Sequence, residues 1–122
     1  MERLFFIIGA ILSGLAVAIG AFGAHGLKAR LSADMLNTFE VGVRYHFYHA
    51  LALFVVAWAC TRWPSATTTA AGWLFVIGII IFSGSLYVLA ITGIRWLGAI
   101  TPFGGLAFLA GWLCLIWSAW KG

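Results

Sequence analysis

The side chains that could do chemistry gather in one short stretch of the sequence, GVRYHFYHALALF, at residues 42–54. It puts an arginine, two histidines and two tyrosines directly against a run of apolar residues. His46 and His49 are three residues apart, so on a helix their side chains diverge by roughly 60° and are close enough to share a site. His49 lies deeper in the apolar run, on the side of Tyr45, so it is the histidine that we expect to point into the protein.

Several kinds of site could use these groups. Histidine exchanges protons near neutral pH and here lies beside phenols and a carboxylate, so proton handling is one candidate. A metal site would need three or four ligands from different helices; His25, Glu40 and His49 could converge, but no ligand-spacing motif supports this. Haem would need His25 opposite His46 or His49. A hydrogen-bonded network that joins helix ends and binds nothing is the further alternative. We predict no metal and no cofactor.

Catalysis has little support in the sequence. There is no nucleophile elbow, no HExxH motif and no phosphate loop, and the chain has only three acidic residues. An acid–base pair of His49 and Glu40 stays open, provided that the two share a cleft. The sequence favours a protein without enzymatic activity over an enzyme.

The composition indicates that helices in a membrane position these groups. Hydrophobic residues make up 64% of the chain and charged residues 8%, whereas about a quarter of a soluble domain is charged. Four apolar runs come close to the ~20 residues with which a helix crosses a bilayer: residues 4–24, 45–63, 70–92 and 102–120. They use nearly the whole chain. We therefore predict an all-α fold, an integral membrane four-helix bundle that forms a single four-span domain over residues 1–122.

The first apolar run could also be a secretory signal peptide, but it is longer than the 7 to 15 residues typical of a signal's apolar region. Its small residues have another use, because they recur at spacings of four and three and so share one helical face. They are Gly9, Ser13, Ala16, Gly20 and Gly23. A second small-residue face lies at residues 107–111. Such faces let helices approach closely, and we expect a homo-oligomer.

The charges of the chain argue for lipid partners. The formal net charge is +4, but the basic residues are scattered at the membrane borders and form no continuous stripe, so we predict no nucleic-acid partner. They are suited to contact membrane lipids. Their distribution is too even for the positive-inside rule to give the orientation. Cys60 and Cys114 have no CxxC spacing and are expected to be packing residues.

Polar residues are distributed unequally between the two ends of the predicted bundle. Four crossings put both termini and the second loop, residues 61–69, at one membrane face, here called face A, and the first and third loops at the other, face B. Face A has the character of a plain anchoring surface. The face B half holds His25, Asp34, Glu40, Arg44, Tyr45, His46, Tyr48, His49, Tyr87, Thr92, Arg95 and Thr101. Polar groups at membrane depth are costly, and they mark sites when they do not reach to the interface.

The first loop has helix-end signals. Gly26 can take the left-handed conformation that ends a helix, and Ser32 can cap a new one with Asp34 in its first turn. The residues that follow are amphipathic, so we predict an interfacial helix between spans one and two, with a bend at Gly42.

The fourth span is expected to begin at Thr101 and Pro102, a capping hydroxyl followed by a residue that needs no N–H partner. Gly104 and Gly105 leave its first turn thin. A neighbouring helix or a ligand can pack closely there.

Four blocks of the sequence look like one known family: GAFGAHGL (residues 20–27), GVRYHFYHALALF (42–54), FSGSLYVLAITG (82–93) and ITPFGGLAFLAGW (100–112). Together they resemble the YgdD/YwdK family of small four-helix membrane proteins, over nearly the whole chain. The resemblance implies a bacterial inner-membrane protein of four spans and brings no activity, cofactor or substrate. The positions that resemble the family pattern are Gly23, His25, Gly42, Tyr45, His49, Ser83, Ser85, Tyr87, Thr101, Pro102 and Gly105. Arg44 and His46 depart from it, so the resemblance favours His25, Tyr45, His49 and Tyr87.

The functional hypothesis that follows is a small binding or permeation module of the bacterial inner membrane. Its predicted pocket lies on face B and is built by His25, Tyr45, His49, Tyr87 and Thr101. It would receive a lipid headgroup, a small solute or a proton. The alternative is a structural or assembly partner in the membrane with no ligand of its own. That alternative predicts a polar cluster satisfied by its own hydrogen bonds and no cavity between the helices.

Overall fold

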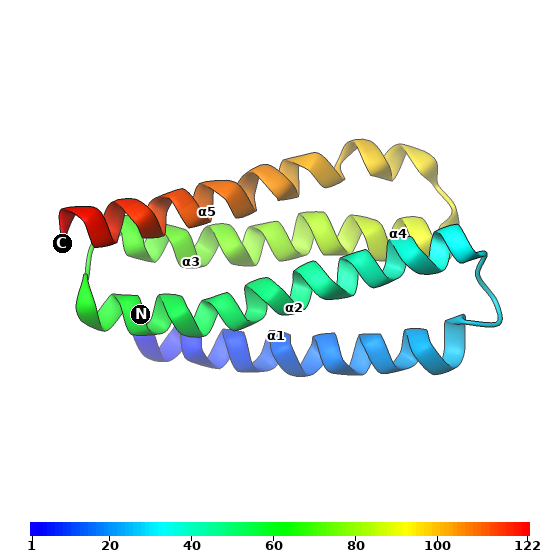
Figure 1. The fold of residues 1–122 in the computed structure, drawn as a ribbon, viewed down its shortest axis with the longest axis horizontal. Helices are drawn as coiled ribbons and strands as arrows, with labels where there is room; N and C mark the ends of the chain where they lie inside the picture. The colour runs from blue at the N-terminus through cyan, green and yellow to red at the C-terminus, as the bar shows by residue number, and fades with distance from the viewer.

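The computed structural model describes residues 1–122 and is helical almost throughout, with no strand (Figure 1). In chain order the elements are α1 (Glu2–Phe22), the π-helical turn η1 (Gly23–Leu27), α2 (Ala33–Arg62), α3 (Ala66–Gly78), the π-helical turn η2 (Ile79–Ser83), α4 (Gly84–Thr92), the 3₁₀ turn η3 (Arg95–Ala99) and α5 (Thr101–Lys121). Because η1 continues α1, and η2 joins α3 to α4 without a break, the chain makes four helical rods.

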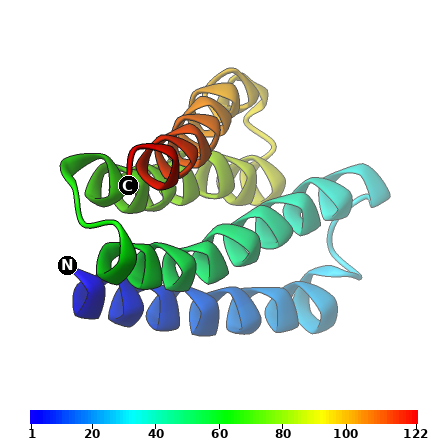
Figure 2. The same cartoon turned by 60° about the vertical axis from the view of Figure 1, so that its left-hand side comes forward.

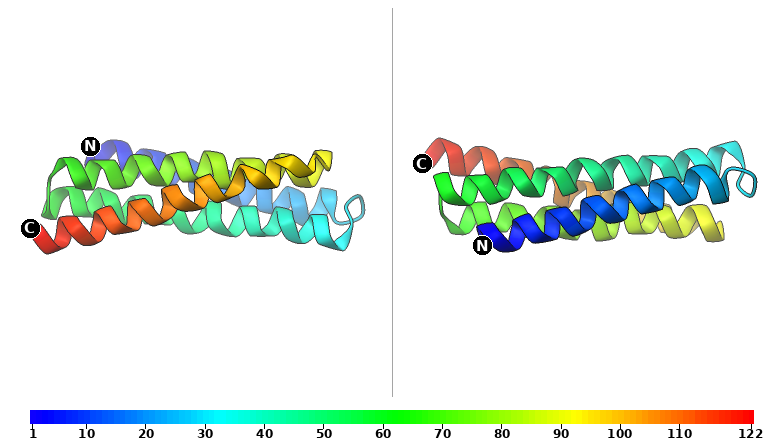
Figure 3. Two further views of the ribbon diagram at one scale, coloured as in Figure 1. Left: turned by 90° about the horizontal axis from the view of Figure 1, so that it is seen from above. Right: turned by 90° about the horizontal axis from the view of Figure 1, so that it is seen from below.

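The four rods lie side by side with alternating directions. Both termini and the α2–α3 connection lie at one end, the face A end, and the other two connections lie at the opposite, face B end (Figures 1 and 3). The rod α1 packs mainly against α2, and α5 packs mainly against α3 (Figure 2). Since α2 and α5 make few contacts with each other, the side between them is only partly closed.

Three of the rods are long and apolar enough to cross a membrane, namely Glu2–Leu27, Ala66–Thr92 and Arg95–Lys121. They correspond to the first, third and fourth apolar runs of the sequence, and these three predictions are confirmed. The rod α2 has 30 residues, but its first half carries Asp34, Glu40 and Arg44 and is therefore less apolar.

The predicted separate interfacial helix is not present. Ser32 does cap a new helix, its Oγ accepting a hydrogen bond from the Met35 N–H at 3.2 Å, but that helix runs without interruption from Ala33 to Arg62. The reason is packing at Gly42, where a Cβ would lie 2.9 Å from a ring carbon of Tyr87. The missing side chain lets α4 pack closely against this segment, so it stays part of the long rod.

Two further expectations about helix ends are corrected. Gly26 is not left-handed; the only residue with a positive φ is Gly93, at 73°, which ends α4. The first rod instead stays right-handed through η1 to Lys28. The α5 helix does begin at Thr101 with a proline in its first turn, but the Thr101 side chain forms no cap. Its hydroxyl bonds elsewhere, as described below.

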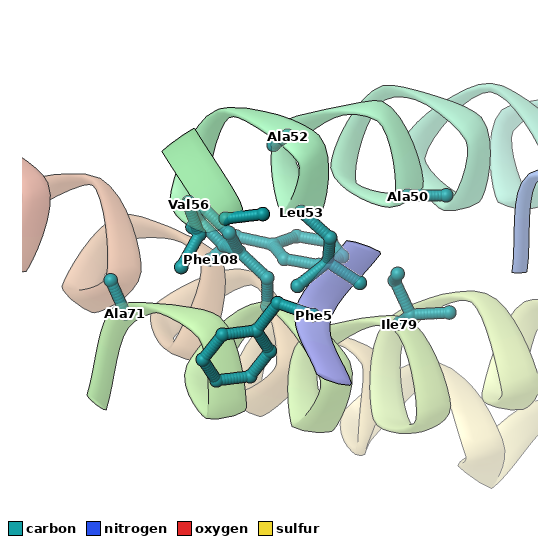
Figure 4. Close-up of a cluster of buried hydrophobic side chains, with 10 residues drawn as sticks. Phe5, Ala50, Ala52, Leu53, Val56, Ala71, Ile79 and Phe108 are labelled. Atoms are coloured by element: carbon teal, nitrogen blue, oxygen red, sulfur yellow. The ribbon is translucent and has the colours of Figure 1, made fainter. Parts of the chain in front are cut away.

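The core lies where all four rods meet, in the half of the molecule nearer face A (Figure 4). Phe5, Leu53, Val56 and Phe75 are fully buried there. Three aromatic rings lie against a glycine of the facing helix, where a Cβ would overlap the ring: Phe5 on Gly72, Phe75 on Gly111 and Phe108 on Gly78. Large rings on small residues give the rods close packing without relying on water to drive them together.

The small-residue face of α1 is used within the chain. A Cβ at Gly9 would lie 3.1 Å from the Ala50 carbonyl oxygen of α2, and one at Gly20 would lie 3.3 Å from Val43. Gly111, in the second small-residue face, packs against Phe75. These faces therefore join helices of one chain, and they no longer argue for a second copy.

Candidate functional site

Four of the five predicted site residues, all except His25, lie on the helices that pack around η2, the wide turn in the third rod. Here the rod loses one of its two neighbours, because α3 packs on both α5 and α2 whereas α4 packs mainly on α2. Gly104 of α5 lies directly against the backbone of Phe82, where a Cβ would overlap the Phe82 nitrogen and Cα. Ser83 is fully buried, and its Oγ donates to the Gly42 carbonyl of α2 at 2.7 Å. The turn is thus held from both sides.

His49 lies on the buried face of α2 and is fixed by two hydrogen bonds. Its Nε2 lies 3.0 Å from Nε1 of Trp112 in α5. Because an indole N–H can only donate, Nε2 must be the acceptor and the proton of the neutral ring must be on Nδ1. Nδ1 in turn lies 2.9 Å from the Tyr45 carbonyl oxygen, to which it donates. Both ring nitrogens are therefore satisfied in one tautomer.

The faces of the His49 ring are covered by aromatic side chains. The ring stacks on Phe108, with centroids 3.6 Å apart and planes 6° from parallel, and it lies 5.3 Å from the Phe75 ring. A second proton on this ring would set an N–H against the Trp112 N–H. The geometry thus holds His49 as a neutral group that ties α2 to α5.

His46 is also buried, with 3% of its surface exposed, and it pairs with Tyr87. Its Nδ1 lies 2.8 Å from the Tyr87 hydroxyl oxygen. If the hydroxyl donates, only Nε2 is left without a partner; the opposite arrangement leaves the phenolic hydrogen unpartnered as well. The first is therefore favoured. Nε2 itself and the Ser13 Oγ of α1 are buried without hydrogen-bond partners.

Thr101 joins a separate small network at the start of α5. Its Oγ1 lies 2.6 Å from Ser85 Oγ, and Ser85 Oγ also donates to the Phe82 carbonyl at 2.9 Å. Thr101 is thus bonded to α4 rather than to its own helix N-terminus.

His25 stands apart from the other predicted residues. It lies in η1 and is exposed, and no side-chain hydrogen bond involves it. No group of three histidine, cysteine, aspartate or glutamate side chains is close enough to hold a metal ion. Glu40 pairs instead with Arg44, at 3.7 Å, and both side chains are about half exposed. Of the five predicted residues, Tyr45 and His49 are brought together, Tyr87 and Thr101 belong to neighbouring networks, and His25 to none.

Tyr45 and His49 line a groove between α2 and α5. It has a volume of about 540 Å³ and is open to the side of the molecule. Phe82 of η2 contributes to it, and α5 contributes Pro102, Gly105, Leu106, Phe108, Leu109 and Trp112. The Tyr45 ring packs on Phe82 with centroids 4.9 Å apart, and the residue is 40% exposed. The lining is almost wholly apolar.

Comparison with known proteins identifies the family of this chain. A family described as "Protein of unknown function (DUF423)" matches residues 19–105. The chain belongs to the DUF423 family. As a DUF423 member it is 49% identical over 120 residues to the UPF0382 membrane protein YwdK of Bacillus subtilis, with 98% of each chain covered. It is also 49% identical over 119 residues to a UPF0382 membrane protein of Staphylococcus haemolyticus, covering 98% of this chain and 97% of the relative. No solved structure gives a significant match.

The comparisons and the three apolar rods agree that this DUF423 protein is a multi-pass bacterial membrane protein. The sequence resemblance had pointed to this family, and that identification is confirmed.

Sequence reasoning missed the partners of the two histidines. Trp112 gave a usable signal, because it stands in the middle of an apolar helix, where a buried indole N–H needs an acceptor. His46 gave one too, since it shares a helical face with Phe39, Gly42, His49 and Leu53 at spacings of three and four, and all are buried.

Proposed function

We propose that this protein is a lipid-binding module in which the groove between α2 and α5 holds one acyl chain. The observation that carries the proposal is the groove itself, a lateral opening of about 540 Å³ with an apolar lining. In a membrane, a groove that opens sideways in an apolar rod bundle faces hydrocarbon, and hydrocarbon chains are the molecules available to fill it. The proposal takes all four rods as spans of a four-helix bundle in the bacterial inner membrane.

The length of the groove suits one leaflet. Its lining on α5 runs from Pro102 to Trp112, ten steps along the helix, or about 15 Å at ~1.5 Å per residue. This is half of the roughly 30 Å of hydrocarbon in a bilayer. Since α5 begins at face B, the occupant would be a lipid of the face B leaflet.

The polar groups of the groove favour a lipid over a solute or a proton. Both nitrogens of His49 are already bonded, so this ring has no free donor or acceptor to offer. The Tyr45 hydroxyl has no bond within the chain, and helical side chains lean towards the helix N-terminus, which for α2 is the face B end. The Tyr45 hydroxyl is therefore suited to form a hydrogen bond with the polar part of a lipid whose acyl chain lies in the groove, on the face A side of Tyr45.

A structural role without a ligand is the second candidate, and one specific observation favours it. The buried polar side chains near η2 form four hydrogen bonds across helices: His49 to Trp112, His46 to Tyr87, Ser83 to the Gly42 carbonyl and Ser85 to Thr101. Such ties are worth about 1 kcal/mol each in a membrane. The expected homo-oligomer would fit this structural role.

An experiment that distinguishes the lipid-binding function from the structural role places a larger side chain in the groove. Gly105 lines it, and a Cβ there would meet only a Phe82 ring carbon at 3.9 Å, so the side chain of Gly105→Leu can start without a clash and occupy the groove. Gly14→Leu is the matched control, because a Cβ at Gly14 has nothing within 4 Å and lies on the far rod α1. Both changes replace glycine by leucine within a helix.

Native mass spectrometry of protein extracted in mild detergent then measures the lipid that remains bound. We expect wild type and Gly14→Leu to retain a lipid and Gly105→Leu to lose it, while all three stay folded by circular dichroism. Equal lipid retention by the three proteins would refute the groove proposal and leave the structural role.

A further inference from the structure

The face A end of the molecule contains a pocket lined by two cationic side chains, which the polar networks of face B do not have. It has a volume of about 460 Å³ and lies between the end of α2, the start of α3 and the end of α5. Its polar lining comes from Arg62, Ser65, Thr67, Ser118 and Lys121.

The side chains of this pocket make it positively charged. Arg62 and Lys121 line it, and no aspartate or glutamate does. Neither cation has a carboxylate partner, since the Glu40–Arg44 pair is the only ion pair in the structure. Each cation lies over an indole ring, Arg62 at 5.8 Å from the Trp63 ring centre and Lys121 at 5.5 Å from that of Trp117. Gly122 also lines the pocket, and a carboxylate at that position would offset one of the two charges.

The start of α3 adds free backbone donors to the same pocket. Ser65 caps this helix by accepting a hydrogen bond from the Thr68 N–H at 3.2 Å. The N–H groups of Ala66 and Thr67 precede the first intrahelical bonds and have no acceptor. Helix N-termini bind phosphate and other anions through such groups and through the helix dipole.

Ser118, which lines the same pocket, carries a hydroxyl without a hydrogen-bond partner. The residue is only 4% exposed, and its Oγ is buried without a hydrogen-bond partner. A helical serine commonly bonds back to the carbonyl four residues earlier, but this one does not. An unpartnered buried hydroxyl costs stability, and the residue that carries this one lines a pocket of positive charge.

An apolar groove adjoins the charged pocket. It has a volume of about 600 Å³ and shares Thr67 and Trp117 with the pocket. Its other lining residues, Leu113, Cys114, Ile116 and Trp120, lie on α5. The cationic pocket at the face A end thus continues into an apolar groove along the side of the molecule.

We propose that this end of the protein is a binding site for an anionic phospholipid. The phosphate would lie between Arg62, Lys121, the Ser118 hydroxyl and the N-terminus of α3, and one acyl chain would lie in the groove along α5. The expectation of a plain anchoring surface at face A is thereby replaced by that of a specific site. The site shares no residue with the α2/α5 groove, so the two proposals stand or fall separately.

The test compares lipid affinity across variants in detergent. The purified protein is titrated with phosphatidylglycerol, with phosphatidylcholine and with inorganic phosphate, and the rise in thermal midpoint gives the dissociation constant. We expect phosphatidylglycerol to bind at least tenfold more tightly than either of the others. Arg62→Gln, Lys121→Gln and Ser118→Ala should each weaken phosphatidylglycerol binding by roughly tenfold, because each removes a hydrogen bond to a charged group.

The matched control is Arg3→Gln, which removes an exposed cation in the first turn of α1 without touching the pocket. It should leave the affinity unchanged. Lys121 is exposed, so its variant tests the site even if another variant folds poorly. Equal weakening by Arg3→Gln, or unchanged affinity in the pocket variants, would overturn the proposal. Binding of inorganic phosphate as tight as that of phosphatidylglycerol would overturn the lipid as its ligand.

Discussion

Replacing Gly104 with alanine should weaken the contact between α5 and the wide turn η2. A Cβ at this position would overlap the backbone nitrogen and Cα of Phe82. A backbone cannot rotate away as a side chain can, so α5 must shift outwards. Overpacking of this kind costs roughly 3 kcal/mol at the upper end of its usual range. Alanine regains about 1 kcal/mol over glycine in a helix, which leaves a net loss of about 2 kcal/mol.

The neighbouring glycine provides the control for this prediction. At Gly105 the nearest atom to a new Cβ is a Phe82 ring carbon at 3.9 Å, an ordinary contact. Alanine there should therefore stabilise the protein by about 1 kcal/mol through helix propensity alone. Unfolding by sodium dodecyl sulfate in mixed micelles, followed by circular dichroism, measures both changes. If Gly104→Ala proved as stable as Gly105→Ala, the close approach of α5 to η2 would be refuted.

Three further changes test other contacts by the same unfolding measurement. His49→Phe keeps a ring against Phe108 but leaves the Trp112 N–H without an acceptor, so it should lower the free energy of unfolding by about 1–3 kcal/mol. Adding Trp112→Phe should recover part of that loss. If it recovers none, the hydrogen bond between His49 and Trp112 is contradicted. Tyr87→Phe removes the hydrogen-bond partner of His46 Nδ1 and should cost about 1 kcal/mol, so unchanged stability would argue against this pair. Gly93→Ala forces a side chain onto a φ of 73° and should cost about 1 kcal/mol; a neutral result would contradict the left-handed end of α4.

Local signals in the sequence predicted the helices well. The apolar runs gave three membrane-capable rods, and the cap at Ser32 was found because a capping serine acts only on its own helix end. The amphipathic segment before Gly42 was interpreted wrongly as an interfacial helix. Its polar residues were counted correctly, but the sequence does not show that α4 packs against this glycine and holds the segment within α2.

The wide turn η2 had no signal in the sequence. Its run of isoleucines is equally compatible with an α-helix, and the difference arises from tertiary contacts, namely Gly104 on one side and the bond from Ser83 to α2 on the other. The partners of the candidate site were equally hidden. His49 and Trp112 are 63 residues apart, and their meeting depends on how two rods are rotated about their own axes.

The wide turn has a consequence for how the third rod tolerates changes in length. A π-helical turn accommodates one residue more than the α-helix it interrupts. Deleting one residue of the isoleucine run would let the rod continue as an α-helix, and the helices on both sides would keep close to their present rotation because the wide turn had absorbed the extra residue. Tyr87 would then still face His46, and Phe75 would keep its place against Gly111. The wide turn is therefore the place in this rod where the loss of one residue leaves the contacts on both sides in register.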